Sequence, residues 1–292
     1  MANSIALRKQ YVTLLDEVYK MASLTSYLDG APDLAREGAN ANELVIPKLT
    51  MSGLANYSRN GGYVNGDATL TYETVACNFD RGRMFSVDAL DNAETAGIAF
   101  GRLAGEFIRT KVVPELDAFR FAKYAQISGI STVNAAALST GAAVVEALRA
   151  AVNKMDEDEV PYEDRHLNIT PTLLGLVEDL DTTKSRAVLA RFAVIHPIPQ
   201  TRFYTKITQY DGTTSGQEAG GYIKDATDGK NINFMIIHRA VAIQFQKHTV
   251  PKIIDPNVNQ DADAWKFGYR TVGIADAYEN KVAGIYLHKS NT

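Results

Sequence analysis

The chain has 292 residues, of which 46% are hydrophobic and 22% charged, and its formal net charge is −4. These proportions are ordinary for a globular protein and exclude a chain too polar to form a core. The negative charge argues against a sequence-specific nucleic-acid binder, which usually carries a concentrated basic patch. Because Cys77 is the only cysteine, one chain can form neither an internal disulfide nor a cysteine-based zinc site.

The beginning of the chain does not have the pattern of a signal peptide. It reads MANSIALRKQYVTLLDEV, without an uninterrupted apolar core or a small-residue cleavage pattern. No apolar run reaches the length of about 18 residues that a membrane span needs. We therefore expect a soluble protein that is made inside the cell.

Residues 43–88 have the pattern of a long hairpin. Residues 43–50 and 68–79 alternate as strands do, and residues 81–87 are expected to extend the second strand. The segment between them, 51–67, is rich in glycine and asparagine, which adopt left-handed backbone conformations at low cost. A long hairpin buries little of itself. We therefore expect neighbouring copies of the chain to cover it.

Residues 91–125 are spaced as one long amphipathic helix. Pro114 falls inside this pattern, and proline has no backbone N–H to continue a helix. We therefore expect a kink near Val113, or a restart of the helix with Pro114 in its first turn.

The apolar face of this helix is expected to lie under strands near the end of the chain. Phe107 and Leu103 are predicted to be buried there, beneath the segment that carries Trp265 and Phe267.

The second half of the chain contains both helices and strands. Helices are predicted at 141–155 and 171–180, a strand at 165–170, a strand, turn and strand at 193–204, and further strands at 233–237, 240–246, 250–254, 269–277 and 284–288.

A search for catalytic, cofactor and metal sites gives no strong candidate. The chain has neither a Walker-type phosphate loop nor a dinucleotide-binding fingerprint. The acidic run 156–164 lacks the alternating ligands and the glycine of a calcium loop. No two histidines stand at metal-ligand spacing, so we interpret all five as structural or surface residues: His166, His196, His238, His248 and His288. We expect no enzyme activity, no cofactor and no metal.

Charged and aromatic residues near the hairpin and along the helix are candidates for contacts between copies of the chain. Arginine suits such contacts because its planar guanidinium binds a carboxylate through two hydrogen bonds. We expect at least one of Arg81 and Arg83 to pair with a carboxylate of an adjacent copy. The candidate set is Tyr57, Arg59, Tyr63, Arg81, Arg83, Glu94, Glu106 and Glu115.

The order of these elements resembles that of the major capsid proteins of tailed bacteriophages, which have the Hong Kong 97 coat-protein fold. The resemblance covers most of the chain and is best over residues 43–125 and 233–289. It rests on the segments VIPKLTMSGLANYSRNGGYVNGDATLTYET, DRGRMFSVDALDNAET, FIRTKVVPELDAFRFAKYA, DADAWKFGYR and ENKVAGIYLHK.

The resemblance implies an α+β fold with four parts. These are an N-terminal arm (1–42), an E-loop hairpin (43–88), a P-domain with a long spine helix (89–138 and 236–292) and an α/β A-domain (139–235). It implies an icosahedral virion shell around double-stranded DNA, built from pentamers and hexamers of the chain, with portal, scaffold or decoration proteins as further partners and no membrane.

Contact with DNA is expected to be weak and without sequence preference. No basic run interleaved with aromatic residues appears, so scattered arm residues such as Arg8, Lys9 and Lys20 are the candidates for phosphate contacts. Two alternatives stay open. An encapsulin-type nanocompartment would share the fold and store enzymes, and a soluble α/β enzyme would need convergent titratable groups in a pocket.

Overall fold

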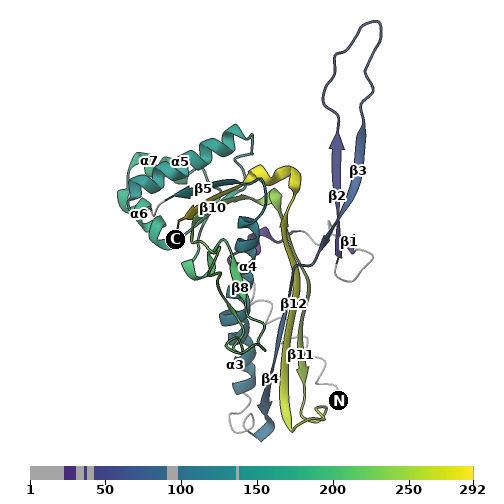
Figure 1. Ribbon diagram of the computed structural model, residues 1–292, viewed down its shortest axis with the longest axis vertical. Helices are drawn as coiled ribbons and strands as arrows, with labels where there is room; N and C mark the ends of the chain where they lie inside the picture. Colours follow the sequence, from purple (N-terminus) through teal and green to yellow (C-terminus); the bar gives the residue numbers. More distant parts are fainter. Residues whose placement is uncertain (1–22, 31–35, 38–42, 91–97, 136–137, 292) are drawn as a thin grey trace.

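A long hairpin projects away from the rest of the protein in the computed structural model, which describes residues 23–30, 36–37, 43–90, 98–135 and 138–291 (Figure 1). Its strands are β2 (Glu43–Met51) and β3 (Ala68–Ala76), which pair antiparallel from Glu43 opposite Ala76 to Met51 opposite Ala68. The short strand β1 (Arg36–Glu37) pairs with the base of β2. The predicted strands out and back are therefore confirmed.

The chain leaves the hairpin earlier than the sequence analysis expected. β3 ends at Ala76, and β4 (Phe79–Asp88) joins a different sheet, of order β11-β12-β4. The cause is Asn78, whose side-chain amide donates to the Ala275 carbonyl at 2.8 Å and accepts from the Ala275 N–H at 3.1 Å. These bonds place the chain alongside β12 (Ala264–Ala277), which in turn pairs with β11 (Ala242–Ile254). The expectation that residues 81–87 extend the hairpin strand is wrong.

The long helix is interrupted where the proline predicts. It consists of α3 (Ile98–Phe107), a π-helical turn (Ile108–Val112) and α4 (Val113–Ala125), with Pro114 in the first turn of α4. Proline cannot donate to a carbonyl of the preceding turn, so the hydrogen-bond pattern widens before it and then restarts. We refer to these three parts together as the spine.

The spine packs against the β11-β12-β4 sheet through a narrower apolar face than expected. Its buried contacts come from Ala104, Ile108, Val113, Leu116 and Phe119. Phe107 and Leu103, which were expected to be buried, are only half-buried. The Phe107 ring, at the end of α3, contacts the rings of Phe85 and Tyr269 at centroid distances of 4.7 and 6.4 Å.

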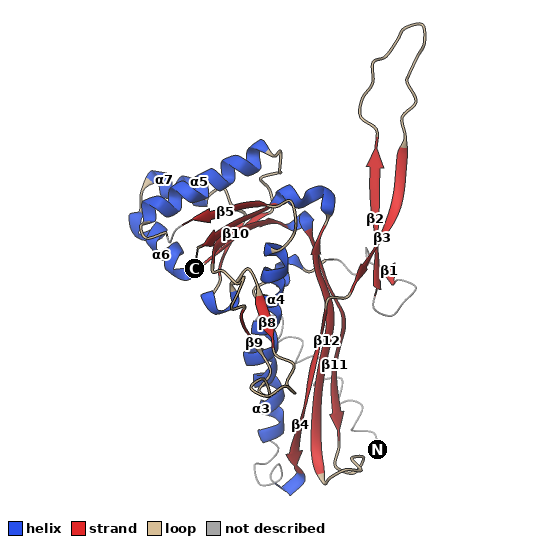
Figure 2. Cartoon of the chain, viewed as in Figure 1, coloured by secondary structure: helices blue, strands red, loops and turns tan. Residues whose placement is uncertain are grey.

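The remaining strands and helices form an α/β lobe beside the upper end of the spine (Figure 2). Its sheet has the order β5-β13-β10-β6-β7, with β13 beside β5 and β6 beside β7 in parallel pairs. The strands are β5 (Ser131–Ala135), β6 (Arg165–Ile169), β7 (Val194–Pro197), β10 (Ile232–His238) and β13 (Ile285–Ser290). The helices are α5 (Gly141–Glu157), α6 (Pro171–Leu180) and α7 (Thr183–Leu189).

Both faces of the lobe sheet are buried. Along β10, Phe234 and Ile236 face the core shared with α5 and α6, whereas Met235 and Ile237 face the core shared with Phe121 of α4. This alternation follows from the two-residue period of a strand. The lobe and the spine therefore share one continuous packing arrangement.

Two parts of the lobe differ from the expectations. Helix α7 was not predicted, and it begins with a capping box between Thr182 and Ser185. The second strand expected within 193–204 is replaced by a 3-10 turn, Gln200–Arg202. Other 3-10 turns lie at Ser26–Leu28, Arg239–Val241 and Glu279–Gly284. A small hairpin of β8 (Ile207–Gln209) and β9 (Tyr222–Lys224) lies near the spine.

Candidate functional site

The hairpin tip exposes apolar side chains that no described part of the chain covers. Tyr57 and Tyr63 contact each other with ring centroids 4.9 Å apart, yet their exposed fractions are 61% and 87%. The turn between them is held by backbone hydrogen bonds between Ser58 and Gly62. A concentration of exposed apolar groups of this kind marks an interaction surface. The tip surface consists of Met51, Leu54, Tyr57, Tyr63, Val64, Leu70 and Tyr72.

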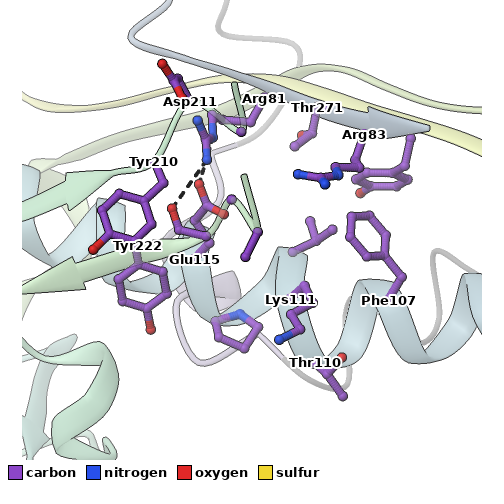
Figure 3. Close-up of a pocket in the computed structure, with 18 of the residues that line it drawn as sticks. Arg81, Arg83, Phe107, Thr110, Lys111, Glu115, Tyr210, Asp211, Tyr222 and Thr271 are labelled. Atoms are coloured by element: carbon purple, nitrogen blue, oxygen red, sulfur yellow. Dashed lines mark hydrogen bonds and ion pairs between the residues drawn. The ribbon is translucent and has the colours of Figure 1, made fainter. Parts of the chain in front are cut away.

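A cavity of about 1070 Å³ lies between the spine, β4 and the loop 210–221 that joins β8 to β9 (Figure 3). Aromatic rings from the loop ends, Tyr210 and Tyr222, line one side of it, and Phe107 of the spine lines another. Arg81 and Arg83 of β4 reach into it. The cavity therefore combines arginines and carboxylates, among them Glu115 and Asp211, with aromatic walls.

Arg81 connects three elements at this cavity. Its Nε donates to the Glu115 Oε1 atom of α4 at 2.8 Å, and its Nη2 donates to the Gly221 carbonyl at 3.4 Å. Gln209 of β8 donates to the same Glu115 oxygen at 3.1 Å. Arg81 and Glu115, both expected at contacts between copies, thus form an ion pair within one chain.

Arg83 holds the outer part of the loop. Its Nη2 donates to the Glu218 carbonyl at 3.0 Å. Gly212 and Gly220 have φ of +77° and +67°, and a Cβ added at either position would lie about 3 Å from Arg83 Nη1. Glycine at both positions therefore allows the left-handed backbone and the close approach of the guanidinium.

Of the other candidate contact residues, Glu106 lines the same cavity as Arg81 and Arg83. Glu106 pairs with Arg109 one turn along the spine at 2.7 Å, with both side chains exposed. Arg59 is exposed at the hairpin tip, and Glu94 lies outside the described residues. Contacts of the candidate set with an adjacent copy stay a prediction.

The Arg83 contacts make a testable prediction about the loop. Replacing Arg83 with alanine should raise amide hydrogen exchange in residues 211–220 several-fold, because the loop loses its hydrogen bond to β4. Global stability should fall by less than about 1 kcal/mol, since one solvent-accessible hydrogen bond contributes little. Arg270→Ala is the matched control. It removes an exposed ion pair to Asp80 on the same sheet and should leave the exchange of the loop unchanged. Unchanged loop exchange in Arg83→Ala would contradict the role given to Arg83.

Comparisons with known proteins identify the fold. No protein-family model matches the chain, and no curated protein matches it in sequence. Solved structures do match. The structure from Gordonia phage Cozz is 13% identical over 93% of this chain and 87% of its own, with a TM-score of 0.59. A virus-like particle from Pyrococcus furiosus is 11% identical over 94% and 96%, with a TM-score of 0.57. The capsid of cyanophage P-SCSP1u is 11% identical over 88% and 86%, with a TM-score of 0.56.

This chain has the Hong Kong 97 coat-protein fold. The fold that the sequence resemblance implied is thereby confirmed. At 11–13% sequence identity, the similarity shows that the chain is folded in the same way, but it does not assign a role to any residue. The special features of this example of the fold must therefore come from its own side chains.

Sequence reasoning missed a buried polar cluster where segment 23–30 meets the spine. Asp117 of α4 is fully buried and accepts hydrogen bonds from the Ser23 and Thr25 hydroxyls at 3.0 and 2.7 Å and from the Leu24 N–H at 3.0 Å. The two hydroxyls share Oδ1, whereas the Leu24 N–H and Arg202, at 3.3 Å, share Oδ2. The signal in the sequence that could have revealed this cluster is Asp117 itself, a charged residue on the apolar face of the predicted helix.

A pair of histidines was also missed. His166 and His196 are hydrogen-bonded between β6 and β7, although they stand 30 residues apart in the sequence. Within the described residues, no group of three or more His, Cys, Asp or Glu side chains is arranged to hold a metal ion. None of the described helices is both long enough and apolar enough to cross a membrane.

Proposed function

We propose that this chain is the major capsid protein of a tailed bacteriophage, which assembles with copies of itself into the icosahedral shell around a double-stranded DNA genome. The observation that carries the proposal is the hairpin tip, which extends away from the protein's own core and exposes Tyr57, Tyr63 and Leu54. The fold and its solved relatives, among them the capsid of a cyanophage, support the same function.

Assembly on this proposal proceeds by many weak contacts. One subunit presents its tip surface to a neighbour, and the neighbour presents a different surface in return. Such heterologous contacts close into rings when the rotation fits, which gives pentamers and hexamers. Once a subunit is held in the forming shell, its further contacts form at a high effective concentration. The assembled shell is therefore more stable than any single interface between two subunits. No catalytic step is needed.

The four parts of the subunit are proposed with the boundaries that the resemblance implies. The arm covers 1–42, the E-loop 43–88, the P-domain 89–138 and 236–292, and the A-domain 139–235. Pairing of β4 with β12 supports a return of the chain to the P-domain sheet already at Phe79. We further propose portal, scaffold or decoration proteins as partners and weak, phosphate-directed contact with DNA. The arm residues proposed for that contact, Arg8, Lys9 and Lys20, lie outside the described residues.

A second candidate with the same fold is an encapsulin-type nanocompartment. The virus-like particle from Pyrococcus furiosus covers nearly the whole of both chains. Shell diameter and contents separate the two, because a phage shell encloses DNA whereas a nanocompartment encloses protein. Electron microscopy of the assembled particles measures both. A soluble enzyme is less well supported, since the Glu115 carboxylate in the large cavity is already engaged by Arg81 and Gln209.

Removing the hairpin tip tests the proposal directly. Residues 52–67 are replaced by Asn-Gly, a two-residue turn that suits antiparallel strands. The wild type should form closed particles by sedimentation and electron microscopy, whereas the variant should remain as subunits or small oligomers. Its cooperative melting should persist, because the tip contributes no buried residue to the core.

Two outcomes would contradict this prediction. Normal shells from the variant would show that the tip is not an assembly surface. Loss of cooperative melting in the variant would show that the tip belongs to the folding unit of a single subunit. A wild-type chain that forms no particle under any condition would overturn the proposed function itself.

A further inference from the structure

Two histidines of neighbouring strands form a nearly coplanar, hydrogen-bonded pair in the lobe sheet. β6 and β7 run parallel, with His166 opposite Val194 and Asn168 opposite His196. This register brings His166 Nδ1 to 3.1 Å from His196 Nε2, with only 11° between the ring planes. Such a hydrogen bond requires one N–H and one bare nitrogen.

Tyr27 lies flat across both imidazoles. Its ring centroid is 4.3 Å from that of His166 and 4.2 Å from that of His196, with interplanar angles of 20° and 11°. Its hydroxyl donates to Asn168 Oδ1 at 3.0 Å and accepts from Asn168 Nδ2 at 2.8 Å. The histidine pair is therefore one surface on which segment 23–30 meets the lobe, beside the apolar contacts of Leu28. We call Tyr27, His166 and His196 the histidine clamp.

We propose that the histidine clamp is an acid-sensitive latch, which keeps segment 23–30 on the lobe with up to one added proton and releases it with the second. A neutral pair shares one N–H between the two nitrogens. One added proton leaves a donor and an acceptor in place and makes the hydrogen bond charge-assisted. A second proton puts two donors and two positive charges face to face at the 3.1 Å contact, which removes the hydrogen bond and adds repulsion.

The surroundings of the pair set the pH at which this occurs. Burial lowers the pKa of His166, an effect that Asp164 opposes and that Arg239 and His238 reinforce. Burial and the neighbouring His166 lower the pKa of His196 to about 4. Both values lie below the ordinary histidine pKa of about 6.5, so the contribution of the pair to stability is complete above that pH. It declines as the pH falls and is lost near pH 4, where His196 takes up its proton.

Segment 23–30 also has two carboxylate contacts that must be distinguished, one at Asp117, which accepts from Ser23, Leu24 and Thr25, and one at Asp29. Asp29 accepts from Arg120 at 3.2 Å and from Gln244 at 2.8 Å, and burial raises the pKa of its carboxyl. Tyr27 itself stays a neutral phenol, since burial raises the pKa of its hydroxyl. Release through either carboxylate would not depend on the identity of residue 196. A substitution there therefore separates the two causes.

The experiment is hydrogen exchange with mass spectrometry on the full-length chain from about pH 7 to pH 3, corrected for the intrinsic pH dependence of exchange. Peptides that cover residues 23–30 should lose protection by up to about tenfold per pH unit as the pH falls from about 6.5 to about 4, the slope for one linked proton between the ordinary pKa and the lowered pKa of His196. His196→Gln places an amide that cannot ionise at the Nε2 position and should keep the segment protected at low pH. His288→Asn is the matched control. It alters another buried histidine, bonded to Asn233, and should behave as the wild type.

A second variant guards against failure of the first to fold. His166→Asn places a neutral amide at the Nδ1 position and should give the same protection at low pH. The proposal is overturned if the wild-type segment keeps its protection down to pH 3. It is equally overturned if the folded variants at positions 166 and 196 lose protection in parallel with the wild type, whether the rest of the chain opens or not. The readout is local to segment 23–30, so it does not depend on the proposed function.

Discussion

Replacing Asp117 with alanine is expected to lower the free energy of unfolding of the subunit by about 3 to 5 kcal/mol, the cost of removing one partner from a buried charged pair. Asp117 has no solvent exposure. It is the common acceptor for the Ser23 hydroxyl, the Leu24 N–H, the Thr25 hydroxyl and the Arg202 guanidinium. Its loss leaves these donors without their acceptor and weakens the attachment of segment 23–30 to the spine, where Arg120 still bonds Thr25 and Asp29.

Urea denaturation of the unassembled subunit measures this effect. Glu106→Ala is the matched control, because Glu106 lies on the same spine and pairs with Arg109, but in an exposed position. The control should lose no more than about 0.5 kcal/mol, since exposed pairs within one helix contribute little. A loss below about 1 kcal/mol for Asp117→Ala would show that solvent or relaxation satisfies the donors.

The elements that the sequence predicted are those whose signals are local. The hairpin was recognisable because strand alternation and a glycine- and asparagine-rich turn lie next to each other along the chain. The restart of the spine at Pro114 was recognisable because one missing donor constrains the neighbouring turn. Helix α6 begins at Pro171, as its composition indicates. Each of these signals acts within a few residues.

Two features that the sequence did not predict depend on partners far away in the chain. Asn78 directs β4 to β12 through Ala275, almost 200 residues later. The Asp117 cluster joins residues more than 90 positions apart. Local periodicity gives no information on such pairings, because many distant segments satisfy the same pattern.

The candidate site also has features that the sequence predicted from local signals and features that depend on distant contacts. Exposure of the tip surface followed from the composition of residues 51–67, since nothing nearby could bury its aromatic residues. The Arg81–Glu115 pair within the chain depended on the unforeseen position of β4 over the spine. Placing β4 in the hairpin therefore led directly to the expectation that its arginines face another copy.

The second large effect is expected where the spine packs against the sheet, and it compares the loss of stability on truncating two phenylalanines of one core cluster. Phe267 of β12 has no solvent exposure, whereas Phe107 of the spine is half-buried. Phe267→Ala is expected to cost about 3 to 5 kcal/mol of unfolding free energy, the range for a buried aromatic residue in a site that cannot collapse. Phe107→Ala should cost about half as much, because solvent already reaches part of its ring.

Equilibrium unfolding of the two variants in urea, with fluorescence as the signal, tests this order. Both variants remove the same atoms from the same cluster, so the difference between them reports burial and not residue type. Equal losses would mean that the interface between spine and sheet closes more tightly over Phe107 than its exposure indicates. A larger loss at Phe107 would restore the face assignment drawn from the sequence, in which this ring is buried under the segment that carries Trp265 and Phe267.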